Sequence, residues 1–235
     1  IRMCEGRFTW MWGDFDMTKI KVWGLMAFTA SMMLSATAHA QVQQLPKPKA
    51  GVVASRLPAT TNALPVGDAR PVWGWVDFCR RTPADCRGGG ARAQDVRLDT
   101  TTWNALVEVN RSINAAIEPI TDQEHWGVPD RWDYPTDARG DCEDYVLLKR
   151  KVLLERGFPR QALLVTVVID HNGEGHAVLT VKTDHGDLVL DNMRDEVLAW
   201  VKTGYRFVKR QSQEDPNRWV ALDDGVAAPA QVAAH

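Results

Sequence analysis

The stretch "GDCEDYVLLKRKVLLERGFP", residues 140–159, decides the fold of this chain of 235 residues. Its apolar residues recur at spacings of three and four, which predicts a helix. Asp141 is a good N-cap residue, and acids in the first turn suit the unpaired backbone N–H groups there. Gly157 fits the position just past the last turn. The stretch therefore predicts one well-bounded helix that carries a cysteine, Cys142, in its first turn.

The period of the sequence changes after this helix. "ALLVTVVI" (162–169), "HAVLTVKT" (176–183) and "DLVLDNM" (187–193) are apolar and rich in β-branched residues, with turn signals between them. Residues 101–118 predict an earlier helix, whose apolar face Asn110 interrupts. Asn110 is either a buried hydrogen-bonding residue or a sign that the face is partly solvated. Helices followed by antiparallel strands predict an α+β fold.

Composition divides the chain into five segments. "MTKIKVWGLMAFTASMMLSATAHA" has two lysines, a short apolar run and an Ala-His-Ala end, which is typical of a secretory signal peptide. The apolar run is short for a membrane anchor, the alternative interpretation. The predicted segments are an over-extended start (1–16), the signal peptide (17–40), a flexible linker (41–70), the folded domain (71–224) and a disordered tail (225–235). The signal peptide predicts export, and in a bacterium the periplasm.

The cysteine count fits an exported protein. Removal of the signal peptide would take Cys4 with it and leave three cysteines. Cys79 and Cys86 can close a short loop as a disulfide in an oxidising compartment. Cys142 is then the odd thiol and a candidate for reactivity, although a buried, inert cysteine is the alternative. The net charge of −2 argues against nucleic acid as a partner.

A nucleophilic thiol needs a base, and the base needs a group that orients it. His176 begins a predicted strand, and Asp191 ends the next one. If the segment between them forms a tight hairpin, the two side chains share a face at one end of the pair. Alone, a histidine at the end of a strand is more often a structural residue. Together, Cys142, His176 and Asp191 form a candidate catalytic triad in that chain order.

The sequence resembles the bacterial transglutaminase-like cysteine proteinases, and in particular their periplasmic, LapG-type members. The resemblance rests on "GDCEDYVLLKRKVLLERGFP", "GHAVLTV" and "LVLDN", and it extends from about Trp103 to Trp219. It implies a papain-like α+β fold in which a helix-start cysteine packs on an antiparallel sheet. It also implies the catalytic roles of Cys142, His176 and Asp191.

The resemblance further implies a calcium site. Adhesin-cleaving members of the family are calcium-dependent through acids around the cysteine, and the matching positions are Asp141 and Glu143, with Asp144 as a third. Calcium takes several oxygen ligands, and a bound dication would reverse the local electrostatics beside the thiolate. Helix capping is the alternative explanation for these acids.

The residues and the resemblance together predict a periplasmic cysteine endopeptidase that forms a thioester intermediate. Its partner would be an exported or surface protein of the adhesin class, as in biofilm-related relatives, and an inner-membrane receptor is a further candidate partner. Two alternatives stay open: thiol acyl transfer of the transglutaminase or amidase type, and a non-catalytic binding module on the same fold. Glycine-rich "CRGGGAR" lacks the lysine of a phosphate loop.

Overall fold

The computed structural model describes residue 4 and residues 57–88, 90 and 92–222. The segments interpreted as signal peptide and tail lie outside these residues, as does most of the segment before Met17. Within the described residues, no helix is both long enough and apolar enough to cross a membrane.

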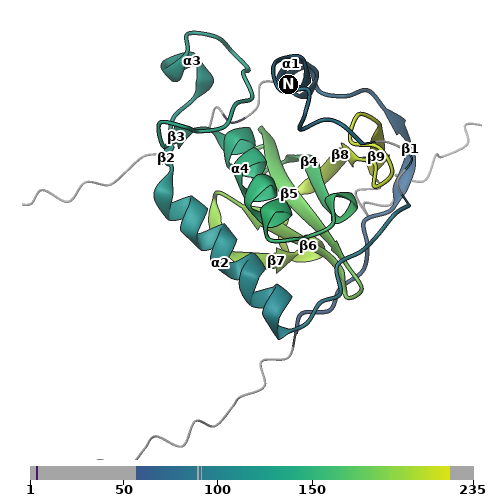
Figure 1. Ribbon diagram of the computed structural model, residues 1–235. Helices are drawn as coiled ribbons and strands as arrows, with labels where there is room; N and C mark the ends of the chain where they lie inside the picture. The colour runs from purple at the N-terminus through teal and green to yellow at the C-terminus, as the bar shows by residue number, and fades with distance from the viewer. Residues whose placement is uncertain (1–3, 5–56, 89, 91, 223–235) are drawn as a thin grey trace, which may run out of the picture. The chain divides into compact units, whose positions relative to one another are not determined.

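An antiparallel sheet of seven strands organises the domain (Figure 1). The strand order is β1-β9-β8-β4-β5-β6-β7. Each neighbouring pair is antiparallel. The strands are β1 (Pro65–Ala69), β4 (Leu163–Ile169), β5 (Gly175–Thr183), β6 (Gly186–Asp191), β7 (Arg194–Ala199), β8 (Arg206–Gln211) and β9 (Trp219–Leu222). Every residue of β5 and β6 is buried, which explains why these strands are continuous apolar runs in the sequence.

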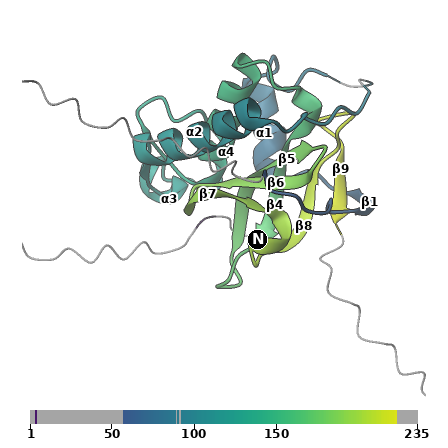
Figure 2. The ribbon, with the colours of Figure 1, turned by 90° about the horizontal axis from the view of Figure 1, so that it is seen from below.

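Helices cover one face of this sheet (Figure 2). The main core lies between them and includes Leu106, Leu147 and Leu179. The helices are α1 (Trp73–Arg81), α2 (Thr100–Ala116), α3 (Asp122–His125) and α4 (Cys142–Glu155), with 3-10 turns η1 (Arg160–Ala162) and η2 (Trp200–Lys202). A smaller cluster that includes Val178 and Phe207 packs on the other face. The predicted α+β class is confirmed.

Helix α4 begins and ends where the sequence indicates. Asp141 is at the N-cap position, and Gly157 adopts a φ of 86° just beyond the last turn. The N–H of Gly157 donates to the carbonyl of Leu154, and that of Phe158 donates to the carbonyl of Leu153, at 3.0 Å each. This pair of bonds is the Schellman motif, and a glycine suits it because other residues resist positive φ.

Asn110 is a buried hydrogen-bonding residue, which settles the alternative that the sequence left open. Its side chain is fully buried on α2. Its amide donates to the carbonyls of Arg194 and Asp195, at 2.8 and 3.1 Å. The polar interruption of the apolar face therefore binds α2 to the start of β7.

Part of the predicted linker belongs to the folded domain. The backbone of residues 65–69 pairs with β9 as strand β1. Ahead of it, Ala63 is buried, its N–H donates to Asp187 and its carbonyl accepts from Arg210. Asp187 also forms buried ion pairs with Lys182 and Arg210, each at 2.8 Å. The linker boundary at residue 70 is therefore corrected, because long-range pairing orders a segment with no apolar period of its own.

Candidate active site

Cys142 is the first residue of α4, and its side chain is buried. The N–H of Ala177, in β5, points at its Sγ at 3.2 Å. The carboxyl Oε2 of Glu143 lies 3.2 Å from the same sulfur. A backbone donor and the helix N-terminus favour a thiolate, whereas an ionised carboxyl group at this distance opposes it. The protonation or pairing of Glu143 therefore controls how readily the Cys142 thiol ionises.

The structure pairs Cys142 with Cys4, which the sequence analysis did not expect. The two cysteines form a disulfide, with Cα atoms 5.8 Å apart. The N–H of Cys4 also donates to the carbonyl of Gly175 at 2.9 Å, which holds residue 4 beside the start of β5. The prediction of Cys142 as the odd thiol therefore applies to a chain without Cys4. Cys79 and Cys86 form the second disulfide, as their spacing predicts.

His176 and Asp191 face each other where β5 begins and β6 ends. Leu179 pairs with Leu190, and the hairpin closes at the pair of Thr183 and Gly186. This register places His176 and Asp191 on one face as diagonal neighbours. The Nε2 of His176 and the Oδ1 of Asp191 are 2.8 Å apart, and both side chains are buried. The hairpin geometry expected from the sequence is therefore present.

The thiol and the imidazole are also close. A ring nitrogen of His176 and the Sγ of Cys142 belong to a group whose atoms lie within 4.8 Å of one another. Because Nε2 is bonded to Asp191, Nδ1 is the nitrogen left to exchange a proton with the thiol. The structure thus brings the three predicted catalytic residues together, while their roles stay predictions.

Asp191 is held as an ionised group. Burial by itself would raise the pKa of its carboxyl group, but hydrogen bonds from His176, Tyr205 and the N–H of Met193 outweigh burial and lower that pKa. The Tyr205 hydroxyl donates to Oδ2 at 2.6 Å, and the N–H of Met193 donates to Oδ1 at 3.0 Å. Each bond favours the charged form. Tyr205 was missed by the sequence analysis because it lies on the distant approach to β8.

The backbone around Asp191 is fixed from α2 as well. The amide of Asn114 donates to the carbonyls of Asp191 and Arg194, at 3.0 Å each. Lys149 of α4 is fully buried, and its Nζ has no hydrogen-bond partner among the described residues. Burial lowers the pKa of Lys149 to about 7, although Asp191 and Asp195 raise it. Asn114 therefore holds the turn that carries the acid.

Five carboxyl groups gather beside the thiol, and the three predicted metal ligands are among them. Carboxyl oxygens of Asp122, Asp130 and Glu143 lie within 4.8 Å of one another, as do those of Asp122, Asp141 and Asp144. Asp141 holds the N-cap position but makes no capping hydrogen bond, and its Oδ1 is buried without a partner. Simple helix capping therefore does not explain Asp141.

Burial and mutual repulsion raise the pKa values of the acids in this cluster. Burial and then Asp122 raise the pKa of Asp141 to about 7. Burial and then Asp141 raise the pKa of Asp144 to about 9, and they raise that of Glu143 well above its usual value. Burial raises the pKa of Asp122 to about 6. The carboxyl groups resist ionisation together, so they need either protons or a cation.

The loop between α2 and α4 supplies the two acids that the sequence analysis missed. Strand β2 (Glu118–Pro119) pairs with β3 (Arg139–Gly140) and closes this loop. A Cβ on Gly140 would lie 2.5 Å from the Oδ2 of Asp144, so glycine is required for the carboxyl group to fit. The informative residues of this loop are its acids, Asp122 and Asp130, whose partners lie elsewhere in the chain.

A helix-start cysteine beside a histidine–aspartate pair on an antiparallel sheet defines the class of transglutaminase-like cysteine peptidases. Residues 66–227 match the model of the family described as bacterial transglutaminase-like cysteine proteinase BTLCP. The match covers more than half of the chain, and the chain therefore belongs to this family of cysteine peptidases. No curated protein matches the sequence.

Solved structures of LapG from Legionella pneumophila are similar. One shares 25% identity, covers 50% of this chain and 68% of its own, and has a TM-score of 0.43. An EGTA-treated form shares 25% identity, covers 52% and 71%, and has a TM-score of 0.44. A calcium-bound form shares 19% identity, covers 66% and 92%, and has a TM-score of 0.41.

Replacing Tyr205 tests whether its hydroxyl tunes Asp191. In a chain that carries Cys4→Ala to free the thiol, Tyr205→Phe removes one donor to the carboxylate, so the pKa of Asp191 rises. The acid-side midpoint of Cys142 alkylation should then move up by about one pH unit, because a hydrogen bond to a charged group contributes about 1.5 kcal/mol or more. The alkylation rate with iodoacetamide, measured from pH 4 to 8, gives this midpoint.

Tyr134→Phe is the matched control, because Tyr134 packs against Phe78 away from the triad. Its midpoint should match that of Cys4→Ala alone. An unchanged midpoint in Tyr205→Phe would show that Tyr205 only packs.

Proposed function

We propose that Cys142, His176 and Asp191 are the catalytic triad of an endopeptidase. The observation that carries this proposal is the 2.8 Å contact of His176 with Asp191 beside the buried sulfur of Cys142. The carboxylate holds the imidazole by Nε2 and leaves Nδ1 free to act as base. Membership of a cysteine peptidase family supports the same reaction.

The reaction follows from these positions. Nδ1 of His176 takes the thiol proton, and the Sγ of Cys142 attacks the carbonyl carbon of a peptide bond. The tetrahedral intermediate collapses to a thioester, and the amine leaves with the proton from His176. Water, deprotonated by His176, then hydrolyses the thioester and restores the thiol. The N–H of Cys142, unpaired within the first turn of α4, suits the oxyanion.

Cys4 indicates how a peptide would reach the thiol. Its N–H donates to the carbonyl of Gly175 while its side chain meets Cys142. A substrate strand that lay along the same path would donate to Gly175 in the same way. It would need Cys4 to be absent or displaced, which removal of a signal peptide would achieve.

We further propose that the five carboxyl groups bind calcium. The donors are all hard oxygens, which suit Ca²⁺, and buried Asp141 Oδ1 has no other partner among the described residues. Asp122, Asp130, Asp141, Glu143 and Asp144 would hold the ion. Bound there, it would supply the positive charge that keeps Glu143 ionised without opposing the Cys142 thiolate. One of the similar LapG structures is itself described as calcium-bound.

The proposed compartment is the periplasm, and the proposed substrate is an exported or surface protein of the adhesin class. The support is the signal-peptide pattern at residues 17–40 together with the family, and an inner-membrane receptor is proposed as a partner on the same basis. In cells that lack the gene, expression of the native chain should restore the shedding of surface proteins into the medium, whereas expression of Cys142→Ala should not. Equal shedding with both would contradict an extracytoplasmic protease role.

Triad variants should lose hydrolysis to different degrees. In the Cys4→Ala background, His176→Ala should lower turnover of a peptide substrate by about 10²–10⁴-fold, because the base is gone. Asp191→Asn should lower it less, since asparagine still contacts the ring but favours another tautomer. Mass spectrometry of products distinguishes cleavage from amine transfer.

His185→Ala is the control for these variants, because His185 lies in the β5–β6 turn and contacts Pro58 instead of the triad. It should retain activity. Full activity in His176→Ala or Asp191→Asn would remove that residue from the triad, and crosslinked products would indicate a transglutaminase.

Calcium should stabilise the protein more at high pH than at low pH. Without a cation, the folded state keeps protons on acids whose pKa values are raised, whereas the unfolded state releases them above about pH 4. The apoprotein should therefore lose stability as pH rises towards 9. Calcium requires ionised acids, so the rise in Tm on adding calcium should be larger at pH 8 than at pH 6. At a hundred times its Kd it contributes about 2.7 kcal/mol.

Thermal melts with EGTA, calcium and magnesium measure this response, and magnesium should restore less than calcium. Asp141→Asn and Glu143→Gln should abolish the calcium response. Asp137→Asn, on an exposed acid of the same loop that pairs with His125, should keep it. If neither chelator nor calcium changes Tm, the proposal of a calcium site is contradicted.

A further inference from the structure

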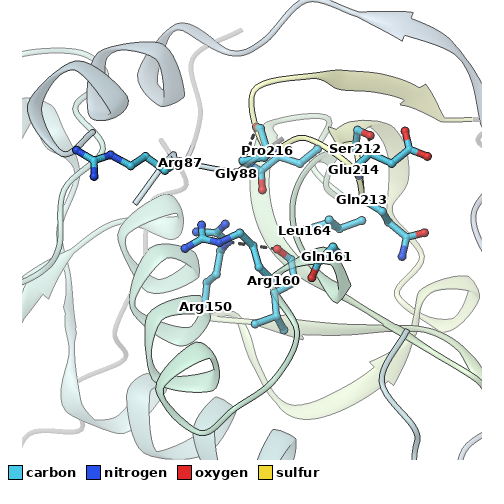
Figure 3. A pocket seen from close by; sticks show the side chains of 12 residues that line it. Arg87, Gly88, Arg150, Arg160, Gln161, Leu164, Ser212, Gln213, Glu214 and Pro216 are labelled. Carbon is cyan, nitrogen blue, oxygen red and sulfur yellow. Dashed lines mark hydrogen bonds between the residues drawn. The ribbon is translucent and has the colours of Figure 1, made fainter. Parts of the chain in front are cut away.

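A cavity lies away from Cys142. It has a volume of about 180 Å³ and is built from the second half of α4, from η1 and the start of β4, and from the segment that follows β8 (Figure 3). Arg150, which lines it, is eight residues beyond Cys142, or about 12 Å along the helix. The lining residues are Arg87, Gly88, Arg150, Arg160, Gln161, Leu163, Leu164, Gln211, Ser212, Gln213, Glu214 and Pro216.

Arg150 is a buried cation; the charge of the Asp85 carboxylate raises its pKa, but the two groups form no ion pair. Only 2% of it is exposed. Its Nε donates to the carbonyl of Leu163 at 3.2 Å, and its guanidinium carbon lies 5.7 Å from the centre of the Trp75 ring. Within the described part of the chain, no carboxylate forms an ion pair with it. Burial, and then the charge of Arg160, lower its pKa to about 10, so the side chain is still protonated at neutral pH.

Arg160 adds a second positive charge to the same cavity. Its Nη1 donates to the backbone carbonyl of Asp85 at 2.6 Å, which neutralises no charge. Three of the twelve lining residues are arginines and one, Glu214, is acidic and exposed. Figure 3 shows Arg150 and Arg160 on one side of the cavity and Glu214 on the other. The cavity therefore has an excess of positive charge.

Contacts other than those of the arginines also hold the walls of the cavity. The disulfide between Cys79 and Cys86 constrains the segment that carries the Asp85 carbonyl. The Asn217 amide donates to the carbonyl of Cys86 at 3.0 Å and ties that segment to the one after β8. Gln211 is fully engaged, accepting from the N–H of Val165 and donating to the carbonyl of Pro216, at 3.0 Å each.

We propose that this cavity binds a small oxyanion, a phosphate or carboxylate group, between Arg150 and Arg160. The planar guanidinium fork matches two oxygens of such a group. A buried charge that forms no ion pair is unfavourable, and an anion in this position would offset both the desolvation of Arg150 and its repulsion by Arg160. This proposal does not depend on the proposed peptidase reaction.

Thermal melts of the full chain in inorganic phosphate test the proposal. Phosphate at ten times its Kd should raise Tm by about 3–6 °C relative to chloride at equal ionic strength. Succinate in a parallel series distinguishes a carboxylate site from a phosphate site. Arg160→Gln should abolish the response. Arg150→Lys should weaken it strongly, because lysine keeps the charge but loses the fork.

Arg156→Gln is the matched control, since Arg156 ends the same helix but pairs with Glu108 outside the cavity. It should respond as the native chain does. The proposal is overturned if neither anion raises Tm beyond chloride, or if Arg160→Gln responds like Arg156→Gln. Because no assay uses Cys142, this outcome is independent of the peptidase proposal.

Discussion

The balance of charge at the start of α4 is the constraint on which the rest of the site depends. One helical turn carries the thiol of Cys142 and the buried acids Glu143 and Asp144, with Asp141 directly before it. A helix N-terminus stabilises an anion by about 0.3–2 kcal/mol. The cost of ionising several buried carboxyl groups together exceeds that contribution, as their raised pKa values show. A thiolate can therefore coexist with them only where protons or a cation compensate.

The sheet makes the second half of the site rigid. His176 and Asp191 belong to strands that are buried along their whole length, so a shift of register by one residue would exchange the side chains of the two packed faces and disrupt both cores. Asn114 and Tyr205 then fix the backbone and the carboxylate of Asp191 from opposite sides. The imidazole has little freedom to leave the line between acid and thiol, which is the preorganisation that acid–base chemistry requires.

Helix α4 separates two regions of opposite charge. Its first turn faces a cluster of acids, while Arg150 in its second half faces an arginine-lined cavity. This arrangement agrees with the helix dipole, because negative groups suit a helix N-terminus and positive groups suit the C-terminal half. Each region concentrates one sign of charge in a buried place, and in each the described side chains leave that charge unbalanced.

The sequence by itself determined the helix of α4, the strands after it and the three residues Cys142, His176 and Asp191. Periodicity, a glycine stop and hairpin spacing act over short distances, so they can be read along the chain. Only the tertiary structure decided that Asp122 and Asp130 join the acids of α4, that Tyr205 bonds to Asp191 and that Cys4 reaches Cys142. It also ordered residues 57–69 and opened the arginine cavity. These contacts join segments far apart in the chain, and no local pattern of residues encodes which distant groups packing will bring together.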